Sequence, residues 1–291
     1  MKWTIQKEHD GMLIKEYLYQ VRGFSRRMIK VAKFEGGKIL VNGEFSTVRR
    51  VLETGNVLEV IFPPENRGAF LKPEHVPLDV LYEDEDVLVI NKPAGMATIP
   101  SRHHLSGTLA NGVLGYYEMR KLPYTVHIVT RLDVYTSGLV LVAKHRFSHS
   151  TLSKDQKQGL VNRRYSAIIS GEMEKNKGIL DGPIGRKPGS IIERIVVEGG
   201  QHATTHYQVE KVLEGYSLVD VKLETGRTHQ IRVHFSHSGH ALLGDDLYGG
   251  SKALIGRQAL HCKSLAFTQP TTNEQLSFTC ELPEDMMKLI K

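Results

Sequence analysis

The sequence predicts an α+β protein in which strands outnumber helices. Residues 139–143 are all apolar and include two valines, which is typical of a short strand buried on both faces. Residues 219–224 alternate between apolar and charged side chains, the pattern of a strand with one buried face. Near the N-terminus, Ile14, Leu18 and Val21 repeat at helical spacing. Both kinds of element are therefore expected in one chain.

Composition limits the class of protein. The chain has 291 residues, of which 40% are hydrophobic and 24% charged, as in a globular protein long enough for two domains. No apolar run resembles a signal core or approaches membrane-spanning length, and the two cysteines, Cys262 and Cys280, form no CxxC pair. We therefore expect a cytoplasmic monomer without a disulfide framework. The net charge of +6 favours a polyanionic partner without identifying it.

Residues 12–61 are expected to form a small unit of their own. Ser25 is placed as the N-cap of a second helix, which ends at Gly36-Gly37. A strand then leads into Asn42-Gly43, a pair that favours a two-residue hairpin turn. A last strand at 57–61 closes the unit.

The second helix of this unit is strongly basic. Charge alone fits a solvated surface as well as a nucleic-acid contact, so both interpretations are open at this point. The basic side chains on or beside the helix are Arg22, Arg26, Arg27, Lys30, Lys33 and Lys38. If they bind RNA, they contact phosphates, which supply affinity and position without sequence readout.

A Pro-rich, polar stretch at 63–68 is the expected linker, and it divides the chain into domains 1–66 and 67–291. The second domain opens with the apolar residues 80–82 and an acidic turn at 83–86. A buried strand at 87–90 and a Pro- and Gly-containing turn at 91–95 follow. The further elements expected in it are a polar helix at 148–158, a strand at 163–169, a hairpin or extended basic loop at 182–200, and a helix at 228–238.

Charged residues stand at two places where function often resides. Arg131 and Asp133 precede the buried strand, where a charged pair is costly unless a partner offsets its desolvation; a structural ion pair is the simplest explanation. Arg227 stands at a turn between a strand and a helix. Four histidines between His229 and His240 suggest a metal, but no cysteine or carboxylate stands at ligand spacing beside them, so we expect none.

Two long motifs resemble those of the RluA-type family of RNA pseudouridine synthases. Residues 131–139 match the core of H-R-L-D-x-x-T-S-G-L, and residues 225–234 match T-G-R-x-H-Q-I-R-x-H. The basic residue and the tyrosine that begin strand 163–169 resemble a third, shorter motif. One position departs from the pattern, because Thr130 stands where the family usually has His.

The resemblance implies an α+β catalytic domain with a central mixed, mostly antiparallel sheet. It implies that Asp133 is the nucleophile or base and that Tyr165 stacks on the extruded uracil. A carboxylate in that place stays ionised only with a cation within about 4–6 Å, for which Arg227 is the candidate and Arg131 the competitor. Lys92 would line the site or contact phosphate. The isomerisation needs neither a metal nor a redox cofactor, so none is expected.

The order of elements in 12–61 resembles the αL RNA-binding motif of ribosomal proteins. This favours RNA of the large ribosomal subunit as substrate, with transfer RNA as the alternative. Thr130 supports a different hypothesis, a non-catalytic RNA-binding or assembly factor with a decayed site, although Asp133, Tyr165 and Arg227 are intact. We expect an active enzyme in which the Thr130 hydroxyl partly replaces the histidine, in contacting RNA or in holding the site open.

Overall fold

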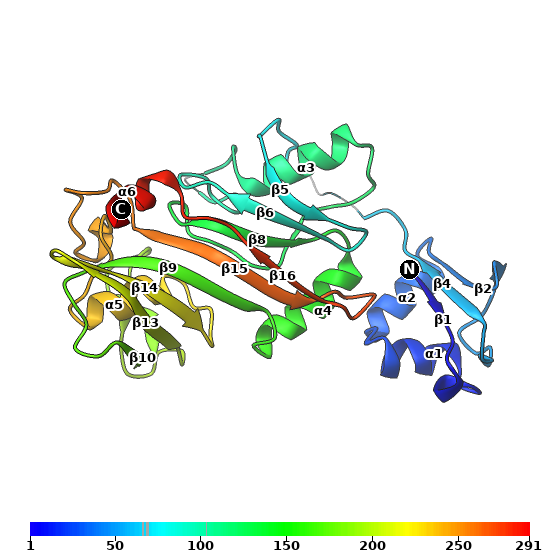
Figure 1. Ribbon diagram of the computed structural model, residues 1–291. Helices are drawn as coiled ribbons and strands as arrows, with labels where there is room; N and C mark the ends of the chain where they lie inside the picture. Colours follow the sequence, from blue (N-terminus) through cyan, green and yellow to red (C-terminus); the bar gives the residue numbers. More distant parts are fainter. Residues whose placement is uncertain (66, 68–69, 103) are drawn as a thin grey trace.

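The computed structural model describes residues 1–65, 67, 70–102 and 104–291. The molecule is elongated, with a small sheet at its N-terminal end and a large sheet through the rest (Figure 1). Each sheet has a hydrophobic core, so we call the part with β1 to β4 the N-terminal domain and the part from β5 onward the large domain. The boundary predicted between 66 and 67, inside the predicted linker 63–68, involves residues that lie outside the described part of the chain.

The N-terminal domain has a four-stranded antiparallel sheet of order β1-β4-β2-β3. Its strands are β1 (Lys2–Thr4), β2 (Lys38–Val41), β3 (Glu44–Phe45) and β4 (Val57–Ile61). Its helices are a 3-10 turn (Lys7–His9), α1 (Ile14–Glu16), a π-helical turn (Tyr17–Val21) and α2 (Arg26–Phe34). Apolar residues of the helices and strands share one core.

Local sequence signals place most of these elements. The Ser25 hydroxyl accepts a hydrogen bond from the Met28 N–H at 3.2 Å, which confirms the predicted N-cap of α2. Asn42 and Gly43 have φ angles of 54° and 85°, the left-handed conformation that a two-residue hairpin turn requires. Strand β1 was not predicted, because it has three residues of which only Trp3 is buried. So short a segment shows no periodic pattern of apolar residues.

The large domain is built on a ten-stranded sheet of order β10-β13-β14-β9-β15-β8-β6-β5, with β16 beside β15 and β7 beside β8. Strands β8 and β15 are parallel, and the other described pairs are antiparallel. The predicted α+β class with a mixed, mostly antiparallel sheet is confirmed. The strands are β5 (Asp79–Glu83), β6 (Val87–Lys92), β7 (His127–Ile128), β8 (Ser137–Ala143), β9 (Asn162–Ser170), β10 (Lys177–Asp181), β13 (Thr204–Leu213), β14 (Tyr216–Leu223), β15 (Leu260–Thr268) and β16 (Gln275–Thr279).

The helices of the large domain are α3 (Leu109–Met119), α4 (Arg146–Lys157), α5 (Gln230–His237), the 3-10 turn Asp246–Tyr248 and α6 (Glu284–Ile290). The predicted basic loop at 182–200 is a small hairpin of β11 (Ile184–Arg186) and β12 (Arg194–Val196). Helix α3 was not predicted. Among the described residues, none of the helices has the length and apolar character needed to cross a membrane.

The middle of the large sheet is where strands from distant parts of the sequence meet. Every residue of β8 is buried, as its apolar pattern predicted. At its start, Gly138 has a φ of 110° and faces Cys262 so closely that a Cβ would lie 2.3 Å from the Cys262 carbonyl oxygen, so a side chain is excluded here. On the next strand, Tyr165 pairs with Cys262. Tyr165 therefore lies two strands from the start of β8.

The two domains meet at Phe147, near the start of α4. Its ring, 2% exposed, belongs to the N-terminal core, 4.8 Å from the ring of Phe24 and 6.2 Å from that of Trp3 between centroids. Close by, the Glu65 carboxylate lies 3.0 Å from Nε2 of His127 in the large domain. The N-terminal domain is thus docked on the large domain by apolar and polar contacts.

Candidate active site

Asp133 lies in the loop between β7 and β8, and the segment after β6 holds this loop in place. The Thr98 hydroxyl donates to the Leu132 carbonyl at 2.7 Å and accepts from the Leu132 N–H at 3.2 Å. On the other side of Asp133, the Val134 carbonyl accepts from the Gly95 N–H at 2.9 Å. The residues flanking Asp133 are therefore fixed by the backbone and side chains of a neighbouring turn.

Lys92 belongs to this support, and the prediction that it contacts RNA is wrong. Its side chain is fully buried, and its Nζ donates to the carbonyls of Pro93, Met96 and Val134 at 2.8, 2.8 and 3.1 Å. Burial lowers its pKa to about 7. An ammonium enclosed in this way holds the loop that carries Asp133, and it has no surface to offer a phosphate.

The cation beside Asp133 is Arg232, which corrects the expectation of Arg227 or Arg131. The Nη1 of Arg232 lies 3.1 Å from Oδ2 of Asp133. Arg227 is exposed, and its Nε donates instead to the His202 carbonyl at 2.9 Å. Arg131 is exposed at the rim of the same cavity. Arg232 is on α5, the helix that follows the Thr225–Arg227 turn. This helix therefore places the positively charged guanidinium beside Asp133.

A second carboxylate fixes Arg232. Its Nε and Nη2 each lie 2.7 Å from an oxygen of Asp245, a bidentate pair that leaves Nη1 for Asp133. Burial acts to lower the pKa of Arg232, but the hydrogen bonds and charges of Asp245 and Asp133 outweigh it and raise the pKa. Arg232 is 8% exposed and Asp133 29% exposed, so the cation is enclosed while the carboxylate reaches the cavity.

Tyr165 lies against the same cavity, as its place on β9 predicted. Its ring is 3% exposed, and its hydroxyl is 3.4 Å from Nη1 of Arg163. Burial raises the pKa of the Tyr165 hydroxyl well above its ordinary value. The hydroxyl therefore keeps its proton at neutral pH.

The turn before α5 is organised by Gln230, a residue that the sequence interpretation passed over. Its buried amide oxygen accepts from the Thr225 hydroxyl at 2.7 Å and from the Arg227 N–H at 3.0 Å. Its amide nitrogen donates to the Thr204 carbonyl and the Thr205 hydroxyl, both at 3.0 Å. This network ties the turn to β13 and sets the direction in which α5 begins.

These elements enclose a small cavity of about 70 Å³ that is rich in arginine. Its charged and aromatic lining consists of Arg131, Asp133, Arg163, Tyr165, Arg227, His229 and Arg232. Leu132, Leu223, Ile231 and Leu260 supply apolar wall. The structure therefore brings together all three predicted catalytic residues and Arg131, and it adds Arg163, His229 and Arg232.

The comparisons with known proteins agree with this geometry. A family model described as RNA pseudouridylate synthase matches residues 86–237. The chain is 53% identical over 280 residues to an uncharacterized RNA pseudouridine synthase of Bacillus subtilis, YjbO, which covers 96% of this chain and 99% of that protein. The chain belongs to the RluA-type family of RNA pseudouridine synthases.

Two further comparisons bear on this synthase. It is 40% identical to a protein of Zymomonas mobilis named ribosomal large subunit pseudouridine synthase D, over 78% of this chain and 76% of that one. Among solved structures, human RNA pseudouridylate synthase domain containing 1 is 25% identical and superposes with a TM-score of 0.59, covering 72% of this chain and 84% of that chain. The fold and the enzyme class predicted from the motifs are confirmed.

Thr130, where the family motif breaks, lies inside the synthase. It is fully buried, and its hydroxyl accepts a hydrogen bond from the Leu141 N–H on β8 at 2.9 Å. The Thr130 N–H in turn donates to the Leu141 carbonyl at 3.2 Å. The expectation that its hydroxyl contacts RNA is therefore wrong, because the hydroxyl is buried and completes the backbone pairing of β8. The expectation that it helps to hold the site open stays a prediction.

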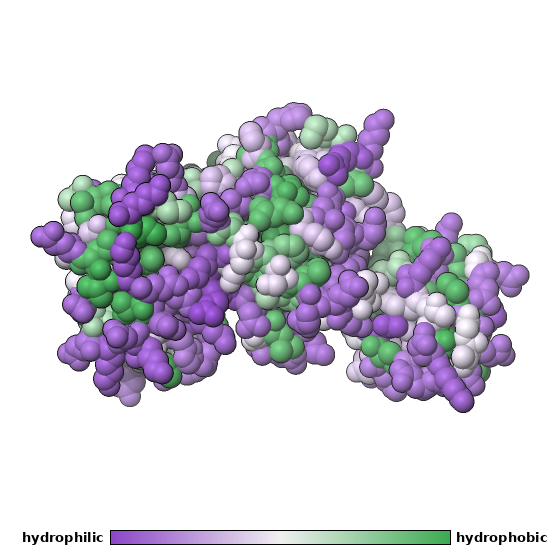
Figure 2. Space-filling model, viewed as in Figure 1, coloured by the Kyte–Doolittle hydropathy of each residue, from purple (hydrophilic) through white to green (hydrophobic). Residues whose placement is uncertain are grey.

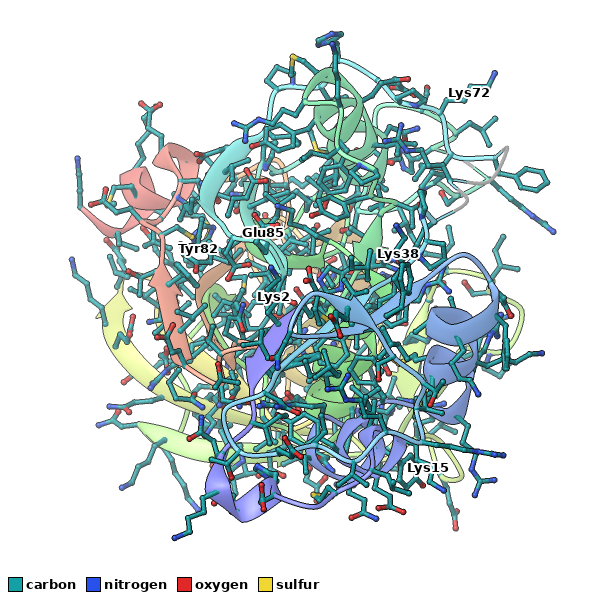
Figure 3. All side chains as sticks on the ribbon, turned by 90° about the vertical axis from the view of Figure 1, so that its right-hand side faces the viewer. Lys2, Lys15, Lys38, Lys72, Tyr82 and Glu85 are labelled. Carbon is teal, nitrogen blue, oxygen red and sulfur yellow. The ribbon has the colours of Figure 1, made fainter. Side chains whose placement is uncertain are left out.

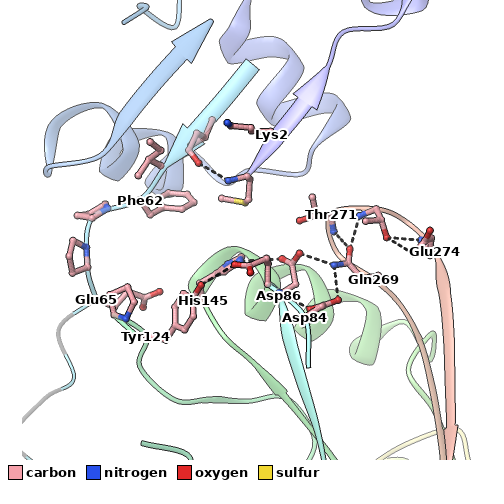
Figure 4. Close-up of a pocket in the computed structure, with 18 of the residues that line it drawn as sticks. Lys2, Phe62, Glu65, Asp84, Asp86, Tyr124, His145, Gln269, Thr271 and Glu274 are labelled. Atoms are coloured by element: carbon pink, nitrogen blue, oxygen red, sulfur yellow. Dashed lines mark hydrogen bonds and ion pairs between the residues drawn. The ribbon is translucent and has the colours of Figure 1, made fainter. Parts of the chain in front are cut away.

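Among the described residues, a second cavity, about 600 Å³, lies between the two domains (Figure 4). The carboxylates that line it are Glu65, Asp84, Glu85, Asp86 and Glu274. Such a lining repels phosphate, and Asp133 is not part of it. The arginine-rich cavity near Asp133 is therefore better suited to RNA chemistry than this larger, acidic one.

Arg131 and Lys92 apart, the basic residues predicted to bind RNA are the six on the N-terminal domain, whose visible face is mostly hydrophilic (Figure 2). Those on α2 with exposed side chains are Arg26, Arg27, Lys30 and Lys33, and Lys38 is exposed at the start of β2 (Figure 3). Arg22 differs, because its guanidinium lies over the rings of Trp3 and Tyr17, 5.2 Å from each centroid. The other five side chains are exposed, although Lys33 and Lys38 also lie over aromatic rings, those of Phe34 and Phe45.

Proposed function

We propose that this synthase converts uridine to pseudouridine in RNA of the large ribosomal subunit, with Asp133 as nucleophile or base. The observation that supports the catalytic part is the pairing of Asp133 with Arg232 at the edge of an arginine-rich cavity. A guanidinium held by Asp245 keeps a positive charge beside the carboxylate without blocking it, because only one nitrogen of Arg232 is used.

The chemistry needs a carboxylate that is ionised and accessible. The C1′–N1 bond breaks, the base turns, C5 joins C1′, and the proton lost from C5 is balanced by one gained at N1. An ionised Asp133 can attack C1′ or remove the C2′ proton, and it leaves or returns the proton as the new bond forms. With 29% of its side chain exposed, Asp133 is open to a nucleotide that enters the cavity.

Tyr165 and the arginines are suited to hold the extruded nucleotide. Base–aromatic stacking contributes about 1–3 kcal/mol per base, so the buried Tyr165 ring can fix the uracil while its sugar faces Asp133. Because its hydroxyl pKa is raised by burial, Tyr165 is better suited to stacking and hydrogen bonding than to acting as a base at neutral pH. The exposed guanidiniums of Arg131 and Arg227 supply partners for the phosphates that flank the uridine.

The substrate class rests on the relatives and on the N-terminal domain. Several relatives at 35–40% identity carry the name ribosomal large subunit pseudouridine synthase D. The exposed cations of α2 provide a second, non-catalytic contact that a large folded RNA can reach. Transfer RNA is the alternative substrate. A non-catalytic role is disfavoured, because Thr130 satisfies the β8 backbone and leaves the Asp133–Arg232 pair intact.

Mapping of pseudouridines tests this proposal. Ribosomal and transfer RNA are compared between cells that have the gene, cells that lack it, and cells that carry the Asp133→Asn variant. We expect at least one large-subunit pseudouridine to disappear without the gene and to return with the wild type but not with Asp133→Asn. The matched control is Asp246→Asn, since Asp246 is exposed and pairs with Lys252 away from the cavity.

The other outcomes separate the alternatives. Loss of a pseudouridine from transfer RNA alone would replace the ribosomal substrate with the alternative. Full restoration by Asp133→Asn would refute the assignment of Asp133. If no pseudouridine disappears and the purified protein modifies no cellular RNA, the non-catalytic hypothesis takes its place.

A further inference from the structure

A histidine lies beside Asp133, and the expected chemistry gives it no role. Nε2 of His229 is 3.7 Å from Oδ2 of Asp133, the same oxygen that Arg232 contacts. Its side chain is 13% exposed and lines the cavity. His229 is also one of the few residues with a left-handed backbone, with φ of 59° and ψ of 18°, at the N-cap of α5.

The hydrogen bonds of Tyr248 determine which nitrogen of His229 carries the proton. The Tyr248 hydroxyl accepts from the Arg194 N–H at 3.0 Å, and it lies 2.7 Å from Nδ1 of His229. Its single proton needs an acceptor, and Nδ1 is the acceptor that the described contacts provide. A neutral imidazole whose Nδ1 accepts carries its proton on Nε2, which is the nitrogen that faces Asp133.

The surroundings keep His229 neutral and Tyr248 protonated. Burial lowers the pKa of His229, and the charge of Arg232 opposes the carboxylate of Asp133 there. Burial also raises the pKa of the Tyr248 hydroxyl. The charged or titratable groups that face His229 are Asp133, Arg194, Arg232, Asp245 and Tyr248. Near neutral pH the imidazole is therefore a fixed, uncharged N–H donor.

We propose that His229 is a positioning residue for Asp133: its Nε2–H, fixed in that tautomer by Tyr248, acts together with Arg232 on Oδ2 and so turns the other carboxylate oxygen towards the ribose. This inference rests on the proposed role of Asp133. At 3.7 Å the contact is longer than a hydrogen bond, and it shortens when a nucleotide fills the cavity and displaces water from the carboxylate. Two donors on one oxygen, from Arg232 and His229, then leave the other oxygen of Asp133 for the reaction.

The backbone of the β11–β12 hairpin determines the orientation of His229 through Tyr248. The β11–β12 hairpin supplies the Arg194 N–H that holds the Tyr248 hydroxyl, so an unbroken path of contacts runs from this hairpin through Tyr248 and His229 to Asp133. The Tyr248 ring also lies under the Arg232 guanidinium, 4.8 Å from its centroid. One tyrosine thus orients both groups that contact Asp133.

Two substitutions of His229 distinguish loss of the N–H donor from an effect on folding. Asparagine tolerates the left-handed backbone but is too short to reach Asp133, whereas glutamine places an amide N–H about where Nε2 lies. The assay is single turnover at saturating RNA, followed as tritium released from uridine labelled at C5 in total RNA from cells lacking the gene. We expect His229→Asn to slow this step about 10-fold to 100-fold, as for the loss of one hydrogen bond to a charged group, and His229→Gln to restore most of the rate. RNA affinity and melting temperature should change little in both.

Tyr248→Phe provides a readout that a purely structural role would not produce. In the wild-type background, the substitution removes the hydroxyl that keeps the His229 proton on Nε2. The imidazole can then also carry its proton on Nδ1, so the rate should fall several-fold. In the His229→Gln background the same substitution should cost nothing, because an amide keeps its N–H whatever the hydroxyl does.

Three results would overturn the inference: an unchanged rate in His229→Asn, a His229→Gln rate no better than that of His229→Asn, or equal costs of Tyr248→Phe in both backgrounds. If His229→Asn does not fold, the Tyr248→Phe comparison alone decides. Asp133→Asn is measured in parallel. If that variant is active, the proposed function fails; if it is inactive while His229→Asn is fully active, only the role of His229 fails.

Discussion

Arg232 reaches Asp133 with one nitrogen at 3.1 Å, because Asp245 occupies its other two contacting nitrogens at 2.7 Å. Asp245 thus fixes the guanidinium on the side away from Asp133, and one nitrogen of Arg232 contacts Asp133. A bidentate pair with Asp133 would neutralise both carboxylate oxygens. The observed arrangement leaves one oxygen free, and it makes the geometry of Asp133 depend on a residue outside the cavity.

Replacing Arg232 by Lys should therefore abolish most activity while keeping the charge. A single ammonium cannot reproduce the planar fork that holds Asp245 and Asp133 together. A displacement of about 1 Å can lower a rate about 100-fold, so we expect a loss of at least that order in single turnover at saturating RNA. Arg227→Lys is the control, because the hydrogen bond described for the Arg227 side chain goes to a backbone carbonyl and not to Asp133. Equal losses in the two variants would contradict the assigned pairing.

Neutralising the α2 surface should weaken RNA binding and reduce its dependence on salt. The variant changes Arg26, Arg27, Lys30 and Lys33 to Gln. For every phosphate that the variant no longer binds, the slope of log affinity against log salt should decrease by about 0.7–0.9. The single-turnover rate at saturating RNA should stay near that of the wild type, because these residues are remote from Asp133 in sequence and belong to the other domain.

The matched control for α2 changes four exposed lysines of the large domain to Gln. The control positions are Lys175, Lys177, Lys288 and Lys291. The net charge changes by the same amount, so a loss of affinity confined to the α2 variant identifies a local contact. If both variants lose affinity and salt slope equally, the effect is one of overall charge, and the N-terminal domain has another role.

Thr130→Val should destabilise the fold, although Val has nearly the same shape. It leaves the Leu141 N–H without its partner, and an unsatisfied buried donor costs about 1–3 kcal/mol. Thr130→Ser keeps the hydroxyl and should lose less. Thr130→His places a larger ring in a filled site, for which overpacking costs about 1–3 kcal/mol, and we expect no gain in catalytic rate. Urea unfolding measures the stabilities; a faster Thr130→His enzyme would contradict this account.

The sequence located the site but not its internal pairing. Asp133, Tyr165 and Arg227 come together as the motifs predicted, because these motifs lie at strand ends that the sheet brings side by side. Spacing could not decide which arginine reaches Asp133, since that depends on the direction of α5. Arg232 was inside the quoted motif, and placing it on a helix five residues after the turn at Arg227 would have made it a candidate.

The other errors concern burial, which a residue type alone does not determine. The family resemblance implies that Lys92 lines the site or contacts phosphate, yet three backbone carbonyls surround its ammonium. The place of Thr130 in the family motif suggests a contact with RNA, yet its hydroxyl bonds to the backbone of the sheet. Both depend on backbone groups from other segments, and those positions are known only once the fold is known.

The contact between Glu65 and His127 should make the domain junction sensitive to acid. Burial acts to raise the pKa of Glu65, but the hydrogen bond and charge of His127 and the Arg146 N–H outweigh it and lower the pKa to about 2. The folded pKa is below the ordinary value of 4.5, so this contribution to stability is complete above about pH 4.5 and is lost as the pH falls towards 2.

Glu65→Gln tests this dependence on pH. At pH 7 the variant should melt lower than the wild type, by about 2–4 °C for each kcal/mol that the ionised carboxylate contributes. The difference should shrink steadily below about pH 4.5. Glu118→Gln, at an exposed position on α3, should match the wild type throughout. A difference between Glu65→Gln and wild type that stays constant down to about pH 2 would show that the charge is not involved.

Phe147 makes the two halves of the protein interdependent. Its ring completes the core of the N-terminal domain, although it belongs in sequence to α4 of the other. A fragment that ends before the large domain would lack that ring, and a fragment without the N-terminal domain would present it to water. Neither half is therefore an autonomous unit that can be transplanted unchanged.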